Sequence, residues 1–428
     1  MTHPAAARVR YRDVLGNREF AAIIASQGLS ITGDQIARIA VAVLVYNRTG
    51  SAFAASATYA AGYLTWLLGG PVLSSLADRY PRRTVMIVCD LGRAGLIAVL
   101  LLPGLPLAVI FAVLVLVGLL APPFDSGRSA TLPDILPGDL YVTGRLIINL
   151  VIQAAQVIGF ALGGVLLATV GSNTALTLDV GTFLVSALAL VAFVQRRPAA
   201  ATEPSGGLLR DTRAGIAVVM QSARMRRLLA YAMVAMAIVI APEGVAIAVS
   251  RRLDGGDVAA GLLTASVPFG FLVGGFLLVR ISSERREGLL PLLCVISAVP
   301  LLFTPLANQV WMVVVLWAIS GSGSALQIVA SAAYIQAAPA AFRSRAYGVA
   351  ATALMGAQGL ALLVAGLLAD WSGARAAVAV LALGGLPARP ALKAPGPGRG
   401  GEPPATGQTT PRAAASAPRH HRPRPPHT

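Results

Sequence analysis

The sequence is poor in charged residues, which make up 12% of its 428 residues, whereas soluble proteins carry about 25%. It has only two cysteines, both within apolar stretches, and four histidines, which lie outside those stretches near the two ends of the chain. These residues give neither a disulfide framework nor a metal-binding cluster. HExxH, GxSxG and Walker lysine motifs are also missing, so we predict that the protein is not an enzyme and binds no cofactor or metal.

Apolar residues dominate instead, at 56% of the chain, and the mean hydropathy is +0.72. This excess excludes a soluble enzyme or a disordered protein for most of the length, and it predicts an all-α polytopic membrane protein. A span needs about 20 mostly apolar residues. We place spans near 20–46, 52–75, 84–103, 105–122, 142–170, 174–194, 228–250, 258–279, 289–306, 309–335 and 346–370, with a shorter twelfth span from residue 374.

The charge balance is strongly positive, with a formal net charge of +16. Of the 34 Lys and Arg residues, 28 fall at the two ends and in alternate predicted loops, whereas four fall in the remaining loops. Cytoplasmic loops of membrane proteins are rich in Lys and Arg. We therefore predict a multi-pass protein of the inner (plasma) membrane, with both termini cytoplasmic if the twelfth span crosses. The same rule explains the charge without a nucleic-acid partner.

A long basic segment divides the predicted spans into six and six. A weak internal repeat crosses it, because a glycine-to-arginine loop begins at Gly70 and a similar one begins at Gly274. We therefore predict two parallel six-helix halves at 1–194 and 228–386, joined by a cytoplasmic linker at 195–227.

The end of the chain differs in composition from the rest. Gly384, Gly385 and Pro387 interrupt the twelfth span after about a dozen residues, fewer than the roughly 20 needed to cross. Residues 387–428 contain 11 prolines and seven Lys and Arg, which predicts a disordered basic tail. Two interpretations stay open: a natural tail after a truncated helix, or a change of reading frame near residue 384.

The loop after the second span has a distinctive pattern. Gly70 is followed eight residues later by Asp78-Arg79 and then by the basic pair Arg82-Arg83, which resembles the loop signature of the major facilitator superfamily. Three further stretches resemble its enterobactin-exporter and macrolide-efflux branch. They are residues 43–51, Leu132-Pro133-Asp134, and Asp179 with Phe183. The resemblance covers about residues 15–384, and it implies the major facilitator fold and a drug:proton antiporter.

The same resemblance implies a cytoplasmic gate in this loop, because the family's acid pairs there with charges and a helix N-terminus of the other half. The implied gate residues are Gly70, Asp78, Arg79, Arg82 and Arg83. Asp125, at the end of the fourth span, is then a candidate partner for Arg79 or Arg82. The alternative is that the three arginines only anchor the topology. The second copy has Ser282 in place of the acid, so we expect an asymmetric lock.

The fifth span contains Gly159-Phe-Ala-Leu-Gly163-Gly164, which resembles the glycine-rich motif on the fifth helix of exporters in this superfamily. Gly159 and Gly163 lie four residues apart, so they share one helix face and let a neighbouring helix approach closely. An export-specific role is the second interpretation, although the family usually has proline where this chain has Phe160.

Ionisable groups within spans are rare because each costs about 2.5–3.5 kcal/mol on insertion scales. Asp34 and Arg38 lie four residues apart in the first span, so they share a face and can neutralise each other. Alternatively, Asp34 holds the coupling proton when Arg38 is drawn elsewhere. Glu243 follows Pro242 without a cation on its own helix, and it is either a cavity group or hydrated near the outer interface.

Two more acids lie within spans. Asp90 and Arg93, three residues apart in the third span, form a second possible pair. Asp179, in the sixth span, has Thr177, Thr182 or a group on another helix as candidate hydrogen-bond partners.

Aromatic and amide side chains within the spans indicate a broad apolar cavity with a few polar groups, as expected for carriers of bulky amphiphiles. The cavity candidates are Tyr59, Tyr63, Gln153, Gln327 and Gln358. For each of them, hydrogen bonding between helices is the alternative role.

We therefore expect a monomeric secondary active transporter whose partners are the lipid bilayer, a small-molecule substrate and protons. It would export small hydrophobic or amphiphilic compounds by proton antiport and alternating access. Two alternatives stay open: a siderophore or secondary-metabolite exporter of the same superfamily, and an inactive remnant with a broken twelfth span.

Overall fold

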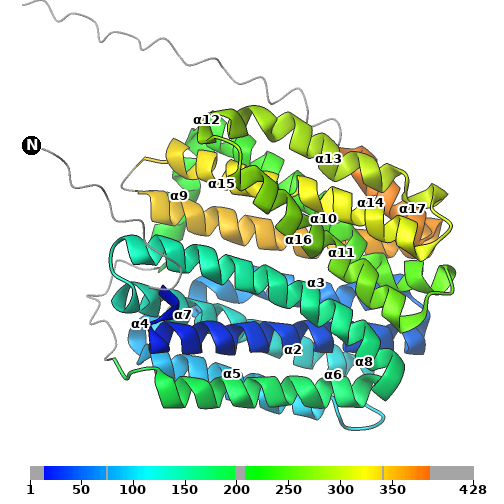
Figure 1. The fold of residues 1–428 in the computed structure, drawn as a ribbon, viewed down its shortest axis with the longest axis horizontal. Helices are drawn as coiled ribbons and strands as arrows, with labels where there is room; N and C mark the ends of the chain where they lie inside the picture. Colours follow the sequence, from blue (N-terminus) through cyan, green and yellow to red (C-terminus); the bar gives the residue numbers. More distant parts are fainter. Residues whose placement is uncertain (1–13, 74–75, 198–207, 340–341, 386–428) are drawn as a thin grey trace, which may run out of the picture. The chain divides into compact units, whose positions relative to one another are not determined.

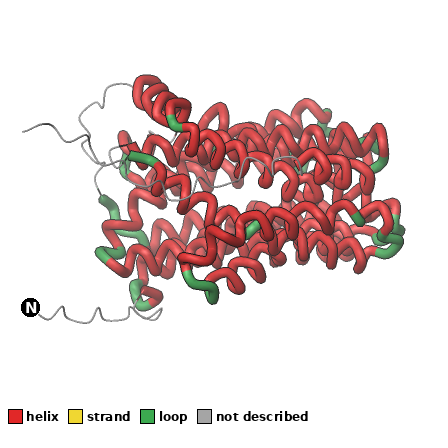
Figure 2. The backbone as a smooth tube through the Cα atoms, turned by 90° about the horizontal axis from the view of Figure 1, so that it is seen from above, coloured by secondary structure: helices red, strands yellow, loops and turns green. Residues whose placement is uncertain are grey.

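The computed structural model describes residues 14–73, 76–197, 208–339 and 342–385. Within these ranges the chain is helical and contains no strand (Figures 1 and 2). We call α2–α8 the first bundle and α10–α17 the second bundle. The helices are α2 (Arg18–Thr49), α3 (Ala52–Leu73), α4 (Leu76–Arg79), α5 (Arg82–Val99), α6 (Leu107–Leu119), α7 (Ala121–Ile135), α8 (Asp139–Phe193), α9 (Leu208–Gln221), α10 (Ala223–Arg252), α11 (Gly256–Val279), α12 (Ser283–Arg286), α13 (Leu290–Leu302), α14 (Val310–Gly323), α15 (Leu326–Ala337), α16 (Arg343–Ser372) and α17 (Ala374–Gly385).

Seven helical segments of the described chain are long and apolar enough to cross a membrane. They are Arg18–Thr49, Leu107–Ile135, Thr143–Phe193, Ala223–Arg252, Gly256–Val279, Val310–Ala337 and Ala346–Ser372. Thr143–Phe193 holds two of the predicted spans, because the helix breaks at Gly171, whose φ of 79° suits glycine. Shorter apolar helices occupy Leu290–Leu306 and Ala374–Gly384. The predicted all-α polytopic fold is therefore confirmed.

The structure has helices where the sequence predicts a loop and a linker. The stretch between the predicted spans at 105–122 and 142–170 is largely helix α7, and Pro122 fits its first turn, where a backbone N–H needs no helical partner. Helix α9 lies within the predicted linker 195–227. Helix α17 has 12 residues, which agrees with a truncated twelfth span. The predicted tail at 387–428 lies outside the described residues.

Apolar side chains are buried in both bundles. In the first bundle, Ile39, Tyr59 and Phe160 belong to one buried cluster that joins α2, α3 and α8. In the second bundle, Trp317 is fully buried, and its indole Nε1 donates to Thr304 Oγ1 at 3.2 Å. Large apolar side chains such as Leu188 nevertheless stay exposed, which suits a surface that faces lipid.

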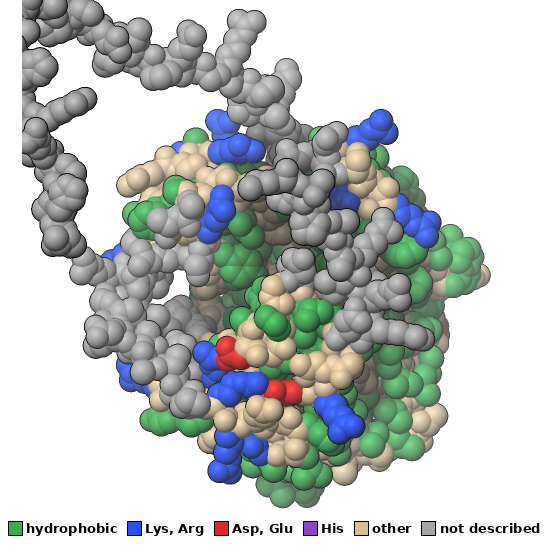
Figure 3. Space-filling model, turned by 60° about the vertical axis from the view of Figure 1, so that its left-hand side comes forward, with side chains coloured by type: hydrophobic (Ala, Val, Ile, Leu, Met, Phe, Trp, Pro, Cys, Tyr) green, Lys and Arg blue, Asp and Glu red, His purple; other side chains and the backbone are tan. Residues whose placement is uncertain are grey.

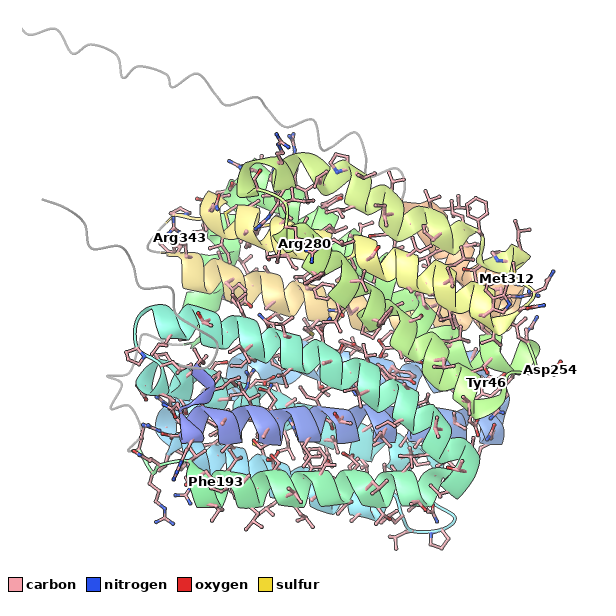
Figure 4. All side chains as sticks on the ribbon, in the orientation of Figure 1. Tyr46, Phe193, Asp254, Arg280, Met312 and Arg343 are labelled. Carbon is pink, nitrogen blue, oxygen red and sulfur yellow. The ribbon has the colours of Figure 1, made fainter. Side chains whose placement is uncertain are left out.

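The helices of both bundles run between two ends, which we name for later use. Phe193 and Arg343 lie at the basic end, and Tyr46, Asp254 and Met312 lie at the opposite end (Figure 4). Lys and Arg side chains gather around the basic end (Figure 3). We call the opposite end the Asp370 end, because α16 finishes there just after Asp370. Placing the basic end in the cytoplasm remains a prediction from charge.

Candidate functional site

A polar pocket lies inside the first bundle. Asp34 and Arg38 of α2 both line it, as their spacing predicts, together with Arg93 of α5 and Asp179 of α8. No ion pair within 4.0 Å joins Asp34 to Arg38 among the four that the described residues form. The two α2 residues therefore form no direct ion pair here, and their mutual neutralisation stays a prediction.

Arg38 interacts with both bundles. Its guanidinium carbon lies 5.8 Å from the centre of the Tyr63 ring, a cation–π contact with α3. It also lies within electrostatic range of two carboxylates, Asp34 on its own helix and Glu243 on α10 of the second bundle. On α10 itself, arginines lie only near the two ends, so Arg38 of the first bundle is a cation near the middle of Glu243's helix. Among the described residues, no ion pair within 4.0 Å joins Arg38 to either acid.

Glu243 is half-buried, and its Oε1 atom is buried without a hydrogen-bond partner among the described residues. It follows Pro242 inside α10, nine residues before that helix ends at Arg252. At about 1.5 Å per residue, this places it roughly 14 Å from the helix end. Both predicted roles of Glu243, a cavity group or an acid hydrated near the outer interface, stay predictions.

Arg93, which lines the pocket, and Asp90, which lies outside its lining, contact groups other than each other. Asp90 accepts a hydrogen bond from Ser186 Oγ at 2.6 Å, and no ion pair to Arg93 is present in this described part of the chain. Arg93 instead lies over Phe124 and Phe183, 5.3 and 5.6 Å from their ring centres. Asp90 and Arg93 therefore form no direct ion pair, although Arg93 lies within electrostatic range of Asp90.

Asp179 is fully buried, and only one of its two predicted threonine partners contacts it. Thr182 Oγ1 lies 3.3 Å from Asp179 Oδ1, whereas Thr177 Oγ1 donates to the carbonyl oxygen of Asn173. The other carboxylate oxygen, Oδ2, is buried without a hydrogen-bond partner among the described residues.

The candidate gate is described only in part. The surroundings of Gly70 and the side chain of Asp78 lie outside what the structure describes. Arg82 contacts Asp134 Oδ2 and the Ala130 carbonyl oxygen, both at 2.7 Å. Arg83 donates to the Val191 carbonyl oxygen of α8.

Asp125 forms an ion pair with Arg128, 3.0 Å away on its own helix. The predicted pairing of Asp125 with Arg79 or Arg82 is therefore wrong. Asp134 follows Asp125 by nine residues, about two and a half helical turns, so the two acids point to opposite sides of α7. Arg82 meets the side that carries Asp134.

The glycines of α8 lie at two helix contacts. A Cβ atom at Gly159 would lie 2.7 Å from the Thr32 carbonyl oxygen of α2, and one at Gly163 would lie 2.6 Å from Ile39 Cγ2. A Cβ atom at Gly164 would lie 2.8 Å from the Cα atom of Gly261. The first two glycines thus pack α8 on α2, and the third brings it against α11 of the second bundle.

The cavity candidates occupy different environments. Tyr59 is buried, with its ring 6.5 Å from that of Phe160, whereas Tyr63 is half-buried beside Arg38. Gln358 is buried and donates to the Leu354 carbonyl oxygen of its own helix at 3.2 Å. Gln153 and Gln327 are half-buried. Tyr63 therefore stays a cavity candidate beside Arg38, whereas the Gln358 amide is hydrogen-bonded within its own helix.

One functional contact was not predicted from the sequence. The carboxylate of Asp370, near the end of α16, accepts hydrogen bonds from Ser51 Oγ and Ala52 N at 2.6 Å each and from Phe53 N at 3.2 Å. An acid of the second bundle therefore caps the N-terminus of α3 in the first bundle. Ser51 directly before an apolar helix was the available signal, but nothing in the sequence pointed to a partner 319 residues away.

Comparisons with known proteins agree with this architecture. The model of the Major Facilitator Superfamily matches residues 23–249. The multidrug efflux pump Tap of Mycobacterium tuberculosis is 29% identical over 38% of this chain and 41% of its own length. The uncharacterized MFS-type transporter YkuC of Bacillus subtilis is 24% identical over 49% of this chain and 51% of its own. The chain thus spans about half or less of the curated relatives that it matches.

Solved structures show the same fold at low sequence identity. A bacterial homologue of the human lysosomal transporter Spinster, inward-facing and unoccupied, has a TM-score of 0.69 at 14% identity, covering 87% of this chain and 96% of its own. The nucleoside transporter NupG has a TM-score of 0.68 at 13% identity, covering 86% and 97%. The chain is a multi-pass membrane protein, and because the family model matches more than half of its residues, it belongs to the Major Facilitator Superfamily.

Proposed function

We propose that this chain is a secondary active transporter that exports small hydrophobic or amphiphilic compounds in exchange for protons. The observation that carries the proposal is the position of Arg38, within electrostatic range of Asp34 in the first bundle and of Glu243 in the second. A movement of one bundle against the other changes which acid the guanidinium neutralises. Proton binding is then tied to the same movement that opens and closes the substrate path.

The coupling follows from simple electrostatics. A carboxylate in a dry site binds a proton when its cationic partner leaves and releases the proton when the partner returns. While Arg38 is drawn to Glu243, Asp34 holds the proton. When the bundles separate around Glu243, Arg38 neutralises Asp34 and the proton leaves. Glu243 supports this cycle because its Oε1 atom is buried without a hydrogen-bond partner among the described residues.

Two observations support an apolar substrate. Tyr63 places an aromatic face beside Arg38, and Tyr59 with Phe160 adds aromatic surface next to it. Aromatic walls with a few polar groups suit compounds that combine an apolar body with a polar or cationic end. The similarity to the multidrug efflux pump Tap, over 38% of this chain, agrees with a substrate of this class.

Everted membrane vesicles from an efflux-deficient host test the proposal. The probe is ethidium, whose fluorescence falls as it is taken into the vesicles and moves away from the nucleic acid outside. We expect uptake driven by an imposed proton gradient with the native chain, and none with Asp34→Asn. Glu243→Gln should retain binding but lose the dependence on the gradient. Asp254→Asn is the matched control, because it neutralises an exposed acid far from Arg38 and should transport normally.

Gradient-dependent uptake by Asp34→Asn equal to that of the native chain would remove Asp34 as the proton carrier. No uptake by the native chain, although the protein is folded and in the membrane, would support the inactive remnant instead. Export of an iron chelate but not of ethidium would favour the siderophore exporter.

A further inference from the structure

The pocket inside the first bundle contains charged groups that the proposed cycle of Arg38 does not use. Asp179 of α8 and Arg93 of α5 line it together with Asp34, and both are at least nine-tenths buried. Each has one buried atom without a hydrogen-bond partner among the described residues, Oδ2 of Asp179 and Nε of Arg93. Buried polar atoms in native proteins are almost always hydrogen-bonded, so these two point to a ligand in the pocket.

The charges around the pocket do not balance. Two acids, Asp34 and Asp179, line it together with the guanidinium groups of Arg38 and Arg93, and a third, buried Asp90, lies outside the lining but within electrostatic range of Asp34. Asp125 of α7 also faces Asp34, but Arg128 neutralises it at 3.0 Å. One acid is therefore left over even when Arg38 stays with Asp34. A second is left over when Glu243 draws Arg38 away.

An uncompensated carboxylate within the membrane must bind a proton or a cation. The described residues contain no group of three or more His, Cys, Asp or Glu side chains that could hold a metal ion. The chemistry of the pocket therefore favours a proton, shared by carboxylates through a hydrogen bond or an ordered water molecule.

The contacts of the acids indicate which of them can share the proton. Asp90 is fixed by the 2.6 Å hydrogen bond from Ser186 Oγ. Asp179 is instead pressed against α2 beside Asp34, because a Cβ atom at Gly33 would lie 2.5 Å from Asp179 Oδ1. Only glycine before Asp34 permits this approach. The acids of α2 and α8 therefore face one pocket at the point where the two helices touch.

We infer that Asp34 and Asp179 together hold an exchangeable proton in this pocket, so that Asp179 is a second proton-carrying residue of the transporter. The inference rests on the proposed function for its role in transport, but the proton itself can be detected without any substrate. In the proposed cycle, Asp179 keeps the proton within the first bundle while Arg38 moves between Asp34 and Glu243.

Infrared difference spectroscopy of the purified full-length protein in liposomes tests the inference. Protonated carboxyl groups give a C=O stretching band that is absent from carboxylates, and the band shifts when water is replaced by D₂O. We expect the native chain at neutral pH to show such a band, and both Asp179→Asn and Asp34→Asn to lose it. Asp254→Asn, which removes an exposed acid, should keep it.

A second variant tests the inference even if Asp179→Asn does not fold. Thr182→Val keeps the acid and removes the hydroxyl group 3.3 Å from Asp179 Oδ1, so it should shift the frequency of the band without removing it. A band that is unchanged in Thr182→Val and in folded Asp179→Asn would overturn the inference. Loss of the native band on adding NaCl at constant pH would also overturn it, since the pocket would then hold sodium. If ethidium export fails while the band behaves as expected, the proposed function fails and the proton site stands.

Discussion

Removal of the Asp370 carboxylate should favour opening of the Asp370 end. In the structure this acid of α16 receives three hydrogen bonds from the start of α3, two of them at 2.6 Å. These bonds join the two bundles directly, so they exist only while this end is closed. The test is Asp370→Ala, with Asp370→Asn as an intermediate step that keeps one acceptor oxygen.

The magnitude follows from the exposure of the contact. Loss of a helix N-cap typically costs about 0.5–2 kcal/mol. Asp370 is exposed, and in the open state water replaces its partners, so a value near 1 kcal/mol is appropriate for the alanine variant. Since about 1.4 kcal/mol is a tenfold change, the ratio of open to closed molecules should rise roughly fivefold.

Distances between two spin labels measure that ratio. Leu102 of the first bundle and Leu306 of the second are both at this end, and their side chains are 57% and 70% exposed, so labelled cysteines fit there without repacking. Cys89→Ala and Cys294→Ala remove the native thiols. Pulsed electron spin resonance in nanodiscs then gives the populations of short and long distances.

The matched control is Asp254→Asn, which removes an equal charge from an exposed position at the same end. We expect it to leave the distance distribution unchanged. If Asp370→Ala also leaves the distribution unchanged, or if both variants change it equally, the three hydrogen bonds do not stabilise the closed end and the argument fails.

Two further predictions concern stability. Gly164→Ala should lower the thermal unfolding midpoint in detergent, because its Cβ atom would meet main-chain atoms of α11. Gly181→Ala has open space around its Cβ atom, so the higher helix propensity of alanine should stabilise the protein by up to about 1 kcal/mol and raise the midpoint slightly. Arg82→Gln should destabilise the protein by about 1–2 kcal/mol, since it loses Asp134 and a carbonyl partner, while exposed Arg79→Gln should change little. Equal midpoints for the two glycine variants, or for the two arginine variants, would contradict these contacts.

The helices could be predicted from hydrophobicity because a helix needs about 20 mostly apolar residues to cross the membrane. The prediction failed at α7, whose prolines and charges resemble a loop. Proline in a first turn and acids on the surface of a helix both fit a regular helix, so composition does not separate the two cases. Only the packing of α7 against α5, through the Arg82–Asp134 pair, distinguishes them.

The candidate site, like the fold, could be predicted from the sequence only in part. Asp34, Arg38 and Glu243 could be found from the sequence because an ionisable group within a span is conspicuous. Their partners could not. Arg38 and Glu243 come from different bundles, and Asp370 meets Ser51 across 319 residues of sequence. Spacing rules describe neighbours on one helix, so they suggested pairs on one helix and missed pairs between bundles.

The contact between Gly164 and Gly261 has a consequence for motion between the bundles. At this point α8 and α11 touch through main-chain atoms of Gly164 and Gly261. Interlocked side chains must change rotamer before two helices can slide, whereas bare backbones present a smooth surface on which sliding breaks few specific contacts. This contact therefore offers little resistance to rocking, whereas the hydrogen bonds of Asp370 must break when the Asp370 end opens. Exposed hydrogen bonds exchange readily with water, so the barrier to each turn of the cycle stays low enough for repeated transport.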